Sequence, residues 1–281
     1  MGHPTVSVTP KSLLLDLLRV TPRPVAVRQL VAVGALFGLE GNAIRVALTR
    51  LVGRGLLASD ERGSYRLAAE ADPVGRWADG WRLGERRLRP WGGTWLCLWH
   101  PRGGDRGGRA RSHRALGRIG FREGRDGLWV RPDNLRAHAP AVEEQLRELG
   151  LAAGSVLFVG QDLPGEVVAG WVDSLWPIEE IAASQRRALR DIERSHARLE
   201  RLAGGEALVE SFLFGGAAIR ALARDPLLPE EIAPGRDRRA LSDAMRHYDR
   251  RGRAIWNDML ELRTAALDGA PIHLGAVDNA P

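Results

Sequence analysis

The feature that most restricts the fold of this chain is a series of short apolar segments, separated by proline and glycine, between residues 11 and 67. Ser12 can cap a first short helix, Leu13 to Val20. Pro22 and Pro24 end that helix, because proline lacks a backbone N–H and its ring clashes with a helical turn. The series therefore begins with one short apolar helix, which the two prolines separate from the next segment.

Two further helices are predicted after the prolines. The second runs from about Val27 to Leu36. Asn42 can cap the third, Ala43 to Val52, which ends near Gly53 and Gly55. Glycine past the last turn is typical of a helix end, since it adopts the left-handed conformation found there.

A hairpin completes this part of the chain. Leu56 to Ala58 and Ser64 to Leu67 have the composition of two short strands, and the charged residues 60–63 between them are typical of a turn. Three helices and then a hairpin, in this order, predict a winged helix-turn-helix domain over residues 10–68.

The third helix has an apolar face and a polar face. The apolar face consists of Ile44, Leu48, Leu51 and Val52. A recognition helix needs this division, because one side docks on its own domain while the other meets base edges and phosphates. An ordinary amphipathic helix with a solvated arginine face would show the same spacing. The residues that we predict to bind DNA are Asn42, Arg45, Thr49, Arg50, Arg54 and, at the tip of the hairpin, Arg62.

Positive charge is concentrated in two parts of the chain. Residues 1–68 hold nine Lys and Arg against four acidic residues, and residues 100–131 hold nine Arg against three. A phosphate-binding surface requires such clustering. Lys11 is the only lysine among 41 basic residues, which fits a genome rich in G and C. Within the second cluster, the block from Arg102 to Arg118 could extend a DNA footprint, bind the phosphates of a nucleotide-containing effector, or form an arginine-rich flexible loop.

Beyond residue 68 the sequence predicts four more segments of an α+β chain. A linker, 69–93, contains a helix from Pro73 to Trp81. Residues 94–175 show the order strand, helix, strand, strand, helix, strand, which predicts a ferredoxin-like domain. Residues 176–268 are predicted to form a helical domain, and 269–281 a disordered tail. The predicted helices of the helical domain are Pro177 to Leu202, Ala207 to Ala223 and Arg238 to Leu267, and the glycine-rich stretch 103–108 is predicted to be a mobile loop.

Motifs of catalysis and metal binding are missing from the sequence. It has one cysteine, Cys97, and no HExxH, P-loop or Gly-x-Ser-x-Gly pattern. We expect no catalytic residues, no metal and no cofactor. No apolar run approaches the roughly 20 residues that span a bilayer, and the N-terminus lacks a signal peptide, so we expect a cytoplasmic protein with no membrane partner. Five of the nine tryptophans fall within residues 77–99, where they could fill a domain interface or stack on a flat ligand.

Several motifs, in order along residues 12–265, resemble the PaaX-type regulators, bacterial repressors of phenylacetic acid catabolism. Ile44-Arg45-x-Ala47-Leu48-Thr49-Arg50-Leu51-Val52 with Gly55-Leu56-Leu57 is similar to the family's recognition helix, and Ser64-Tyr65-Arg66-Leu67 to its wing strand. Three motifs resemble the family's central domain, which is like that of the Cas2 nucleases. They are Trp95-x-x-x-Trp99, Leu116-x-x-Ile119-Gly120-Phe121 and Gly127-x-Trp129-Val130-x-Pro132. Asp225-Pro226-x-Leu228-Pro229 resembles its DPxLP signature.

The resemblance implies a homodimer that binds double-stranded DNA at a palindromic operator and represses a catabolic operon. It also implies release by an aryl-acyl-CoA such as phenylacetyl-CoA, although the residues that bind the effector are unknown. The chain departs from the family pattern in three places. Ser184 and Gln185 stand where the family usually has an aromatic residue, residues 232–237 lack the family's Trp, and the central loop is rich in Arg and Gly.

Two other classes of function are compatible with parts of the sequence. A Cas2-like metal-dependent nuclease would need a carboxylate near the end of its first strand, where this chain has Trp99-His100-Pro101-Arg102. A winged helix can also act as an adaptor that binds protein. Such an adaptor would show no salt-dependent DNA binding.

Overall fold

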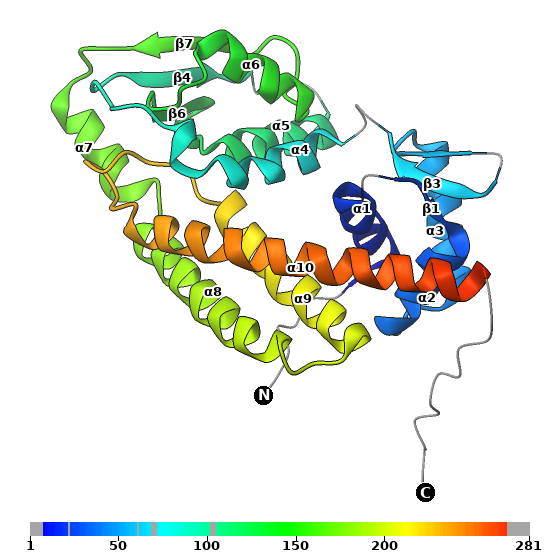
Figure 1. Cartoon of the computed structure of the whole chain (residues 1–281). Coiled ribbons are helices and arrows are strands. Elements are labelled where there is room, and N and C mark those ends of the chain that lie inside the picture. The colour runs from blue at the N-terminus through cyan, green and yellow to red at the C-terminus, as the bar shows by residue number, and fades with distance from the viewer. Residues whose placement is uncertain (1–7, 22, 61, 69–71, 102–104, 269–281) are drawn as a thin grey trace, which may run out of the picture. The chain divides into compact units, whose positions relative to one another are not determined.

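The structure is a computed structural model that describes residues 8–21, 23–60, 62–68, 72–101 and 105–268 (Figure 1). Contacts divide the chain into two compact units. The first unit comprises residues up to 71, 196–213 and those from 248 on, and the second comprises 72–195 and 214–247. The five-segment division stays a prediction. Its disordered tail, 269–281, and residues 103–104 of its mobile loop lie outside the described residues.

The first unit contains the winged helix-turn-helix that the sequence predicts. Its elements are α1 (Pro10–Val20), β1 (Val25–Ala26), α2 (Val27–Leu36), α3 (Gly41–Gly53), β2 (Leu57–Ser59) and β3 (Ser64–Leu67). The strands form an antiparallel sheet in the order β1-β3-β2. The two-residue strand β1 was not predicted, because Val25 and Ala26 become a strand only by pairing with Tyr65 and Ser64.

Two predicted helix caps are wrong. Helix α1 is capped by Thr9 rather than Ser12, because their side chains form a reciprocal box in which each hydroxyl accepts the other's backbone N–H at 3.1 Å. Helix α3 is capped by Glu40, whose backbone carbonyl accepts a hydrogen bond from Ile44 N at 3.2 Å. Asn42 is therefore the second residue of α3 and leaves its side chain exposed.

The core of the first unit joins segments that are far apart in the sequence. Leu13, Leu30 and Ile44 are fully buried in it. Three long helices also run through the C-terminal third of the chain: α8 (Ile178–Leu199), α9 (Gly204–Ala223) and α10 (Arg236–Asp268). Leu208 of α9 and Trp256 of α10 belong to the same core cluster.

The second unit contains the predicted ferredoxin-like order of elements. They are β4 (Trp95–Trp99), α5 (Arg106–Ile119), β5 (Arg122–Arg125), β6 (Leu128–Pro132), α6 (Ala139–Glu148) and β7 (Val156–Gly160). The four strands form an antiparallel sheet in the order β5-β6-β4-β7, so the first and third strands of the motif lie in the middle. This strand order confirms the ferredoxin-like fold.

Each face of this sheet is partly covered, and Trp99 of β4 and Val156 and Phe158 of β7 remain exposed. Leu96 and Leu98 of β4 pack against Leu116 of α5 and Leu146 of α6. On the other face Trp95 lies in a second cluster with residues of α7 (Gly165–Ser174). The Trp95 ring meets those of Trp91, Trp171 and Trp176 at centroid distances of 5.7, 5.1 and 6.2 Å. Trp95 is thus part of a core of the second unit.

Two predictions about local structure in the second unit need correction. The predicted helix Pro73 to Trp81 ends at Asp79, as α4 (Pro73–Asp79), and a 3₁₀ helix, η1 (Gly80–Arg87), comes directly after it. The end of the predicted mobile loop is helical, since α5 begins at Arg106. Asp105 caps it by accepting the Gly108 N–H at 2.7 Å, which offsets the weak helix propensity of the glycines. No helix in the part of the chain that is described has the length and apolarity to cross a membrane.

Candidate nucleic-acid interface

Helices α2 and α3 pack closely across a tight turn. Gly38 adopts a φ of +69° there, which glycine does without strain. A Cβ on Gly34 of α2 would lie 2.8 Å from Cγ1 of Ile44, so glycine allows the apolar face of α3 to approach α2. Ile44, Leu48 and Leu51 are each at most 2 % exposed. The packing of this apolar face therefore determines which face of α3 is left for solvent.

The opposite face of α3 carries polar side chains. Asn42, Arg45, Thr49 and Arg50 are exposed, and Arg54 is exposed just after the helix. Thr49 Oγ1 donates to the backbone carbonyl of Arg45 at 3.2 Å, which leaves the hydroxyl oxygen able to accept a hydrogen bond from outside. The structure thus brings five of the six predicted residues together on and beside one helix.

Arg62, the sixth residue, lies on the wing. Asp60 orders the turn between β2 and β3, because its Oδ1 accepts the backbone N–H groups of Arg62 at 3.0 Å and Ser64 at 2.8 Å. The Arg62 side chain is exposed. Asp60 therefore holds the turn at the wing tip, and the Arg62 side chain remains exposed to solvent.

Two residues beside this surface, Lys11 and Val46, were not predicted to belong to it. A groove of about 390 Å³ runs between the start of α1 and α3, and its lining includes Lys11, Val46, Arg50 and Arg54. Val46 is 41 % exposed although it is apolar, and Lys11 is exposed. The exposure of Val46 is due to its place one residue after Arg45 on the polar face. The position of Lys11 depends on how α1 packs on α3, which the spacing of residues does not reveal.

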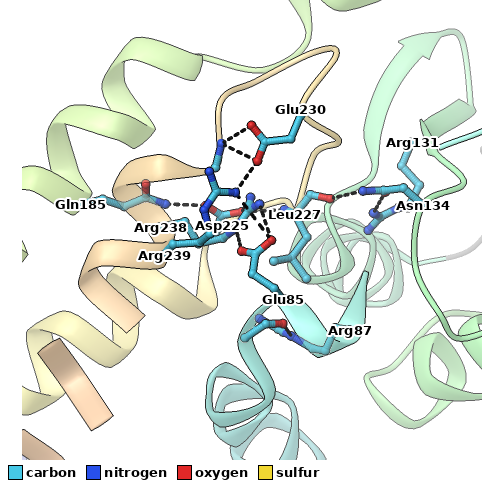
Figure 2. A network of polar contacts seen from close by, with 12 residues as sticks. Glu85, Arg87, Arg131, Asn134, Gln185, Asp225, Leu227, Glu230, Arg238 and Arg239 are labelled. Atoms are coloured by element: carbon cyan, nitrogen blue, oxygen red, sulfur yellow. Dashed lines mark hydrogen bonds and ion pairs between the residues drawn. The ribbon is translucent and has the colours of Figure 1, made fainter. Parts of the chain in front are cut away.

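A buried polar network lies in the second unit (Figure 2). The side chain of Arg238 is 6 % exposed and pairs with Glu85 at 2.7 Å and with Asp225 at 3.2 Å. Burial alone would lower the pKa of Arg238, but the charges of Asp225 and Glu85 and their hydrogen bonds together raise it. Asp225 Oδ1 also accepts Leu227 N at 2.6 Å, which fixes the start of the Asp225-Pro226 segment.

Gln185 and Asn134 extend this network. Gln185 Nε2 donates to Asp225 Oδ2, so the glutamine that departs from the resembled family pattern has a structural partner here. Asn134 Nδ2 donates to the carbonyl of Leu227 at 2.8 Å, and Asn134 Oδ1 accepts from Arg131 at 2.9 Å. Burial lowers the pKa of Arg131 to about 9, so Arg131 is still charged at neutral pH. These contacts hold the segment after α9 in place.

Among the described residues we find no group of three or more His, Cys, Asp or Glu side chains that could hold a metal ion. His100 comes after β4, at the place where a Cas2-like nuclease would need a carboxylate. It is buried, and its Nδ1 lies 3.0 Å from Ser155 Oγ.

Comparison with known proteins identifies the segment that carries the predicted DNA-binding residues. Residues 8–71 match the model of the family described as PaaX-like protein. The chain is also similar to the solved structure of the uncharacterized protein Rv0674 from Mycobacterium tuberculosis, with 26 % sequence identity and a TM-score of 0.60. The similarity covers 92 % of this chain and 100 % of that one. No curated protein matches the chain. The resemblance to PaaX-type proteins is thereby confirmed over residues 8–71, and it suggests a transcriptional regulator.

Proposed function

We propose that this chain, which is PaaX-like over residues 8–71, is a dimeric transcriptional repressor that reads DNA with α3 and its wing. The observation that carries the proposal is the division of α3 into a buried apolar face and an exposed face with Asn42, Arg45 and Thr49. Helices of this kind enter the major groove with their polar side toward the base edges.

The exposed residues divide into two roles. Asn42, Arg45 and Thr49 contact base edges, because amide, guanidinium and hydroxyl groups can match the donor and acceptor pattern of the major groove. Arg50, Arg54 and Arg62 contact phosphates, which sets the register of the protein on the duplex. Among the described residues no ion pair holds Arg45, Arg50, Arg54 or Arg62, so their charge is available to a polyanion.

Two copies of the chain bind a palindromic operator. A two-fold dimer places its recognition helices on half-sites about 10 bp apart, or a multiple of that spacing. DNA is released when an aryl-acyl-CoA, such as phenylacetyl-CoA, binds the conformation of the dimer in which the two recognition helices no longer match the spacing of the half-sites. The part of this proposal that concerns the dimer and the effector rests on the resemblance to PaaX-type regulators.

Selection of bound duplexes from a random pool, and then fluorescence anisotropy on the selected sequence, tests DNA reading. The wild-type chain should select a two-fold symmetric sequence and lose affinity steeply as salt increases. Arg45→Ala should weaken binding by about 1–3 kcal/mol, roughly 5- to 150-fold, and should relax the preference at one base pair of each half-site.

Arg125→Ala is the matched control for that measurement. Arg125 is also exposed, but it lies at the end of β5 in the second unit. The control should bind the selected duplex as the wild type does. Unchanged affinity and sequence preference in Arg45→Ala would overturn the assigned role of α3, and failure of the wild-type chain to select any sequence would overturn the function itself.

A further inference from the structure

The second unit contains a cavity of about 390 Å³ whose wall is dominated by arginine. The arginines come from α4, η1, α5 and β6 and from the loop after β6. They are Arg76, Arg86, Arg87, Arg118, Arg131 and Arg136, and Asp225 is the only carboxylate among the described residues of the lining. A volume of this size lies within the range of pockets that bind small organic molecules.

Several of these arginines form no ion pair with described residues, although Asp225 lies in the lining and its charge acts on Arg87 and Arg131. Asp225 is already engaged by Arg238, Gln185 and the backbone of Leu227. Arg131 donates to neutral oxygens, including those of Pro132 and Asn134. In the described part of the chain Arg86, Arg87, Arg118 and Arg136 form no ion pair, whereas Arg76 pairs with Glu148.

Burial makes the unmatched charge costly. It lowers the pKa of Arg118, and the neighbouring charge of Arg114 lowers that pKa further. Burial also lowers the pKa of Arg87, against the opposing effect of the Asp225 and Glu85 charges. A buried charge without a counter-charge raises the free energy of the folded state. An anion in the cavity would remove this cost and would receive several guanidinium donors at once.

Part of the cavity wall is apolar. The guanidinium of Arg118 lies over the Trp77 ring at 5.7 Å, and Trp77 Nε1 donates to the Arg118 carbonyl at 3.0 Å, so the ring is fixed in the wall. Leu83 and Leu135 also line the cavity. This wall can pack against the organic part of a ligand while the arginines hold its charged part.

We propose that this cavity binds a small organic phosphate, with the phosphate on Arg118 and Arg136 and the organic part against Trp77 and Leu83. A phosphate group suits the site because it carries up to two negative charges on several acceptor oxygens, which planar guanidinium forks can address together. Binding at this site is independent of DNA reading by α3. A role for the bound phosphate in releasing DNA rests on the proposed function.

Isothermal titration calorimetry with sodium pyrophosphate, at constant ionic strength, tests the site in the full-length protein. The wild-type chain should show saturable binding with one site per chain. Arg118→Gln with Arg136→Gln should weaken the affinity for pyrophosphate at least about tenfold, since the double variant removes two charged groups of hydrogen-bond donors.

Arg125→Gln is the control, because it removes an exposed arginine of the same unit that does not line the cavity. It should bind pyrophosphate as the wild type does. Arg136→Glu alone serves as a second variant in case the double variant unfolds. Arg136 is exposed and, among the described residues, only its backbone N–H forms a hydrogen bond, to the Arg87 carbonyl at 2.8 Å.

Two results would overturn the proposal. One is the absence of saturable pyrophosphate binding to the wild-type chain, and the other is equal weakening in the control and in the cavity variants. Anisotropy on the selected duplex separates this proposal from the proposed function. A chain that binds pyrophosphate but no DNA would support the phosphate site and contradict the proposed repressor function. A chain that binds DNA but no pyrophosphate would support the repressor function and contradict the phosphate site.

Discussion

Two groups of arginines lie in opposite surroundings. One group is on α3 and the wing, and the other lies around Asp225. Arg45, Arg50 and Arg62 extend into solvent and form no ion pair with described residues. Arg238 and Arg131 are almost completely buried, and hydrogen bonds hold their guanidinium groups on several sides. The first group is suited to bind a partner, whereas the second group holds the fold together.

This difference shows that a high arginine content does not by itself indicate function. Forty of the basic residues are arginine, so a genome bias toward this residue supplies it at every kind of site. What separates the two groups is burial and the presence of hydrogen-bond partners within the chain. Stability and DNA affinity should therefore depend on different arginine-bearing regions.

The largest expected effect is on stability in the second unit. Asp225→Ala should lower the free energy of unfolding by about 3–5 kcal/mol, because it leaves the buried charge of Arg238 with Glu85 as its remaining carboxylate partner. Urea denaturation monitored by circular dichroism measures the loss. The control is Asp243→Ala, which removes an exposed carboxylate paired with Arg246 and should cost less than about 1 kcal/mol. Equal costs for the two variants would contradict the distinction between buried and exposed arginines.

The next effect concerns the packing of α3 in the first unit. Gly34→Ala would place a Cβ 2.8 Å from Ile44 Cγ1 and 2.9 Å from its Cδ1, so α3 or the Ile44 side chain must shift. We expect a loss of roughly 1–3 kcal/mol in stability, typical of overpacking, together with weaker DNA binding. Gly53→Ala is a suitable control, because nothing lies within 4 Å of a Cβ at that position of α3. Anisotropy that shows full DNA affinity for Gly34→Ala would mean that the position of α3 is not critical.

An exposed arginine should affect DNA binding and leave stability unchanged. Arg54→Ala should weaken binding to all duplex sequences alike and reduce the slope of log K against log salt by about 0.9, which corresponds to one phosphate contact. Its unfolding free energy should stay within about 0.5 kcal/mol of the wild type. A change in sequence preference instead of the salt slope would assign Arg54 to base reading.

The smallest expected effect is a pH dependence in the second unit. Burial, and then the neighbouring charge of His113, lowers the pKa of His100 from its ordinary value of 6.5. Below pH 6.5 the unfolded chain binds a proton on this imidazole before the folded chain does, so the free energy of unfolding should decrease as the pH falls below 6.5. An NMR titration of the His100 ring protons should give a pKa below 6.5. A value at or above 6.5 would show that this imidazole is not shielded from water.

The local structure of the first unit was largely predictable from the sequence. The bounds of α2 and the buried face of α3 were predictable from apolar spacing, and the hairpin from its charged turn. The caps were not predicted correctly, because Thr9, which caps α1 through its side chain, and Glu40, which caps α3 through its backbone carbonyl, lie just outside the apolar segments. The DNA-binding residues could be named because they lie on one helix and one turn.

The features of the second unit that concern binding could not be predicted in the same way. Its cavity joins Arg86, Arg118 and Arg136, which are separated by about 20 to 30 residues at each step and converge only after the sheet has formed. The role of Gln185 depends on Asp225, which lies 40 residues further along the chain. Such contacts have no periodic signature in the sequence, so folding in three dimensions is needed to reveal them.

The core of the first unit has a consequence for synthesis of the protein. Trp256 and Leu260 of α10 pack in the same cluster as Leu13 and Leu48, and Gln29 Nε2 donates to the Leu260 carbonyl at 3.1 Å. A ribosome that has translated only the N-terminal third of the chain has therefore made the DNA reader without the residues that complete its core. Because domains fold as their residues emerge, we infer that the core of the DNA reader is completed only after Leu260 has left the ribosome. Chains that end before Trp256 would lack part of this core and should compete poorly for the operator.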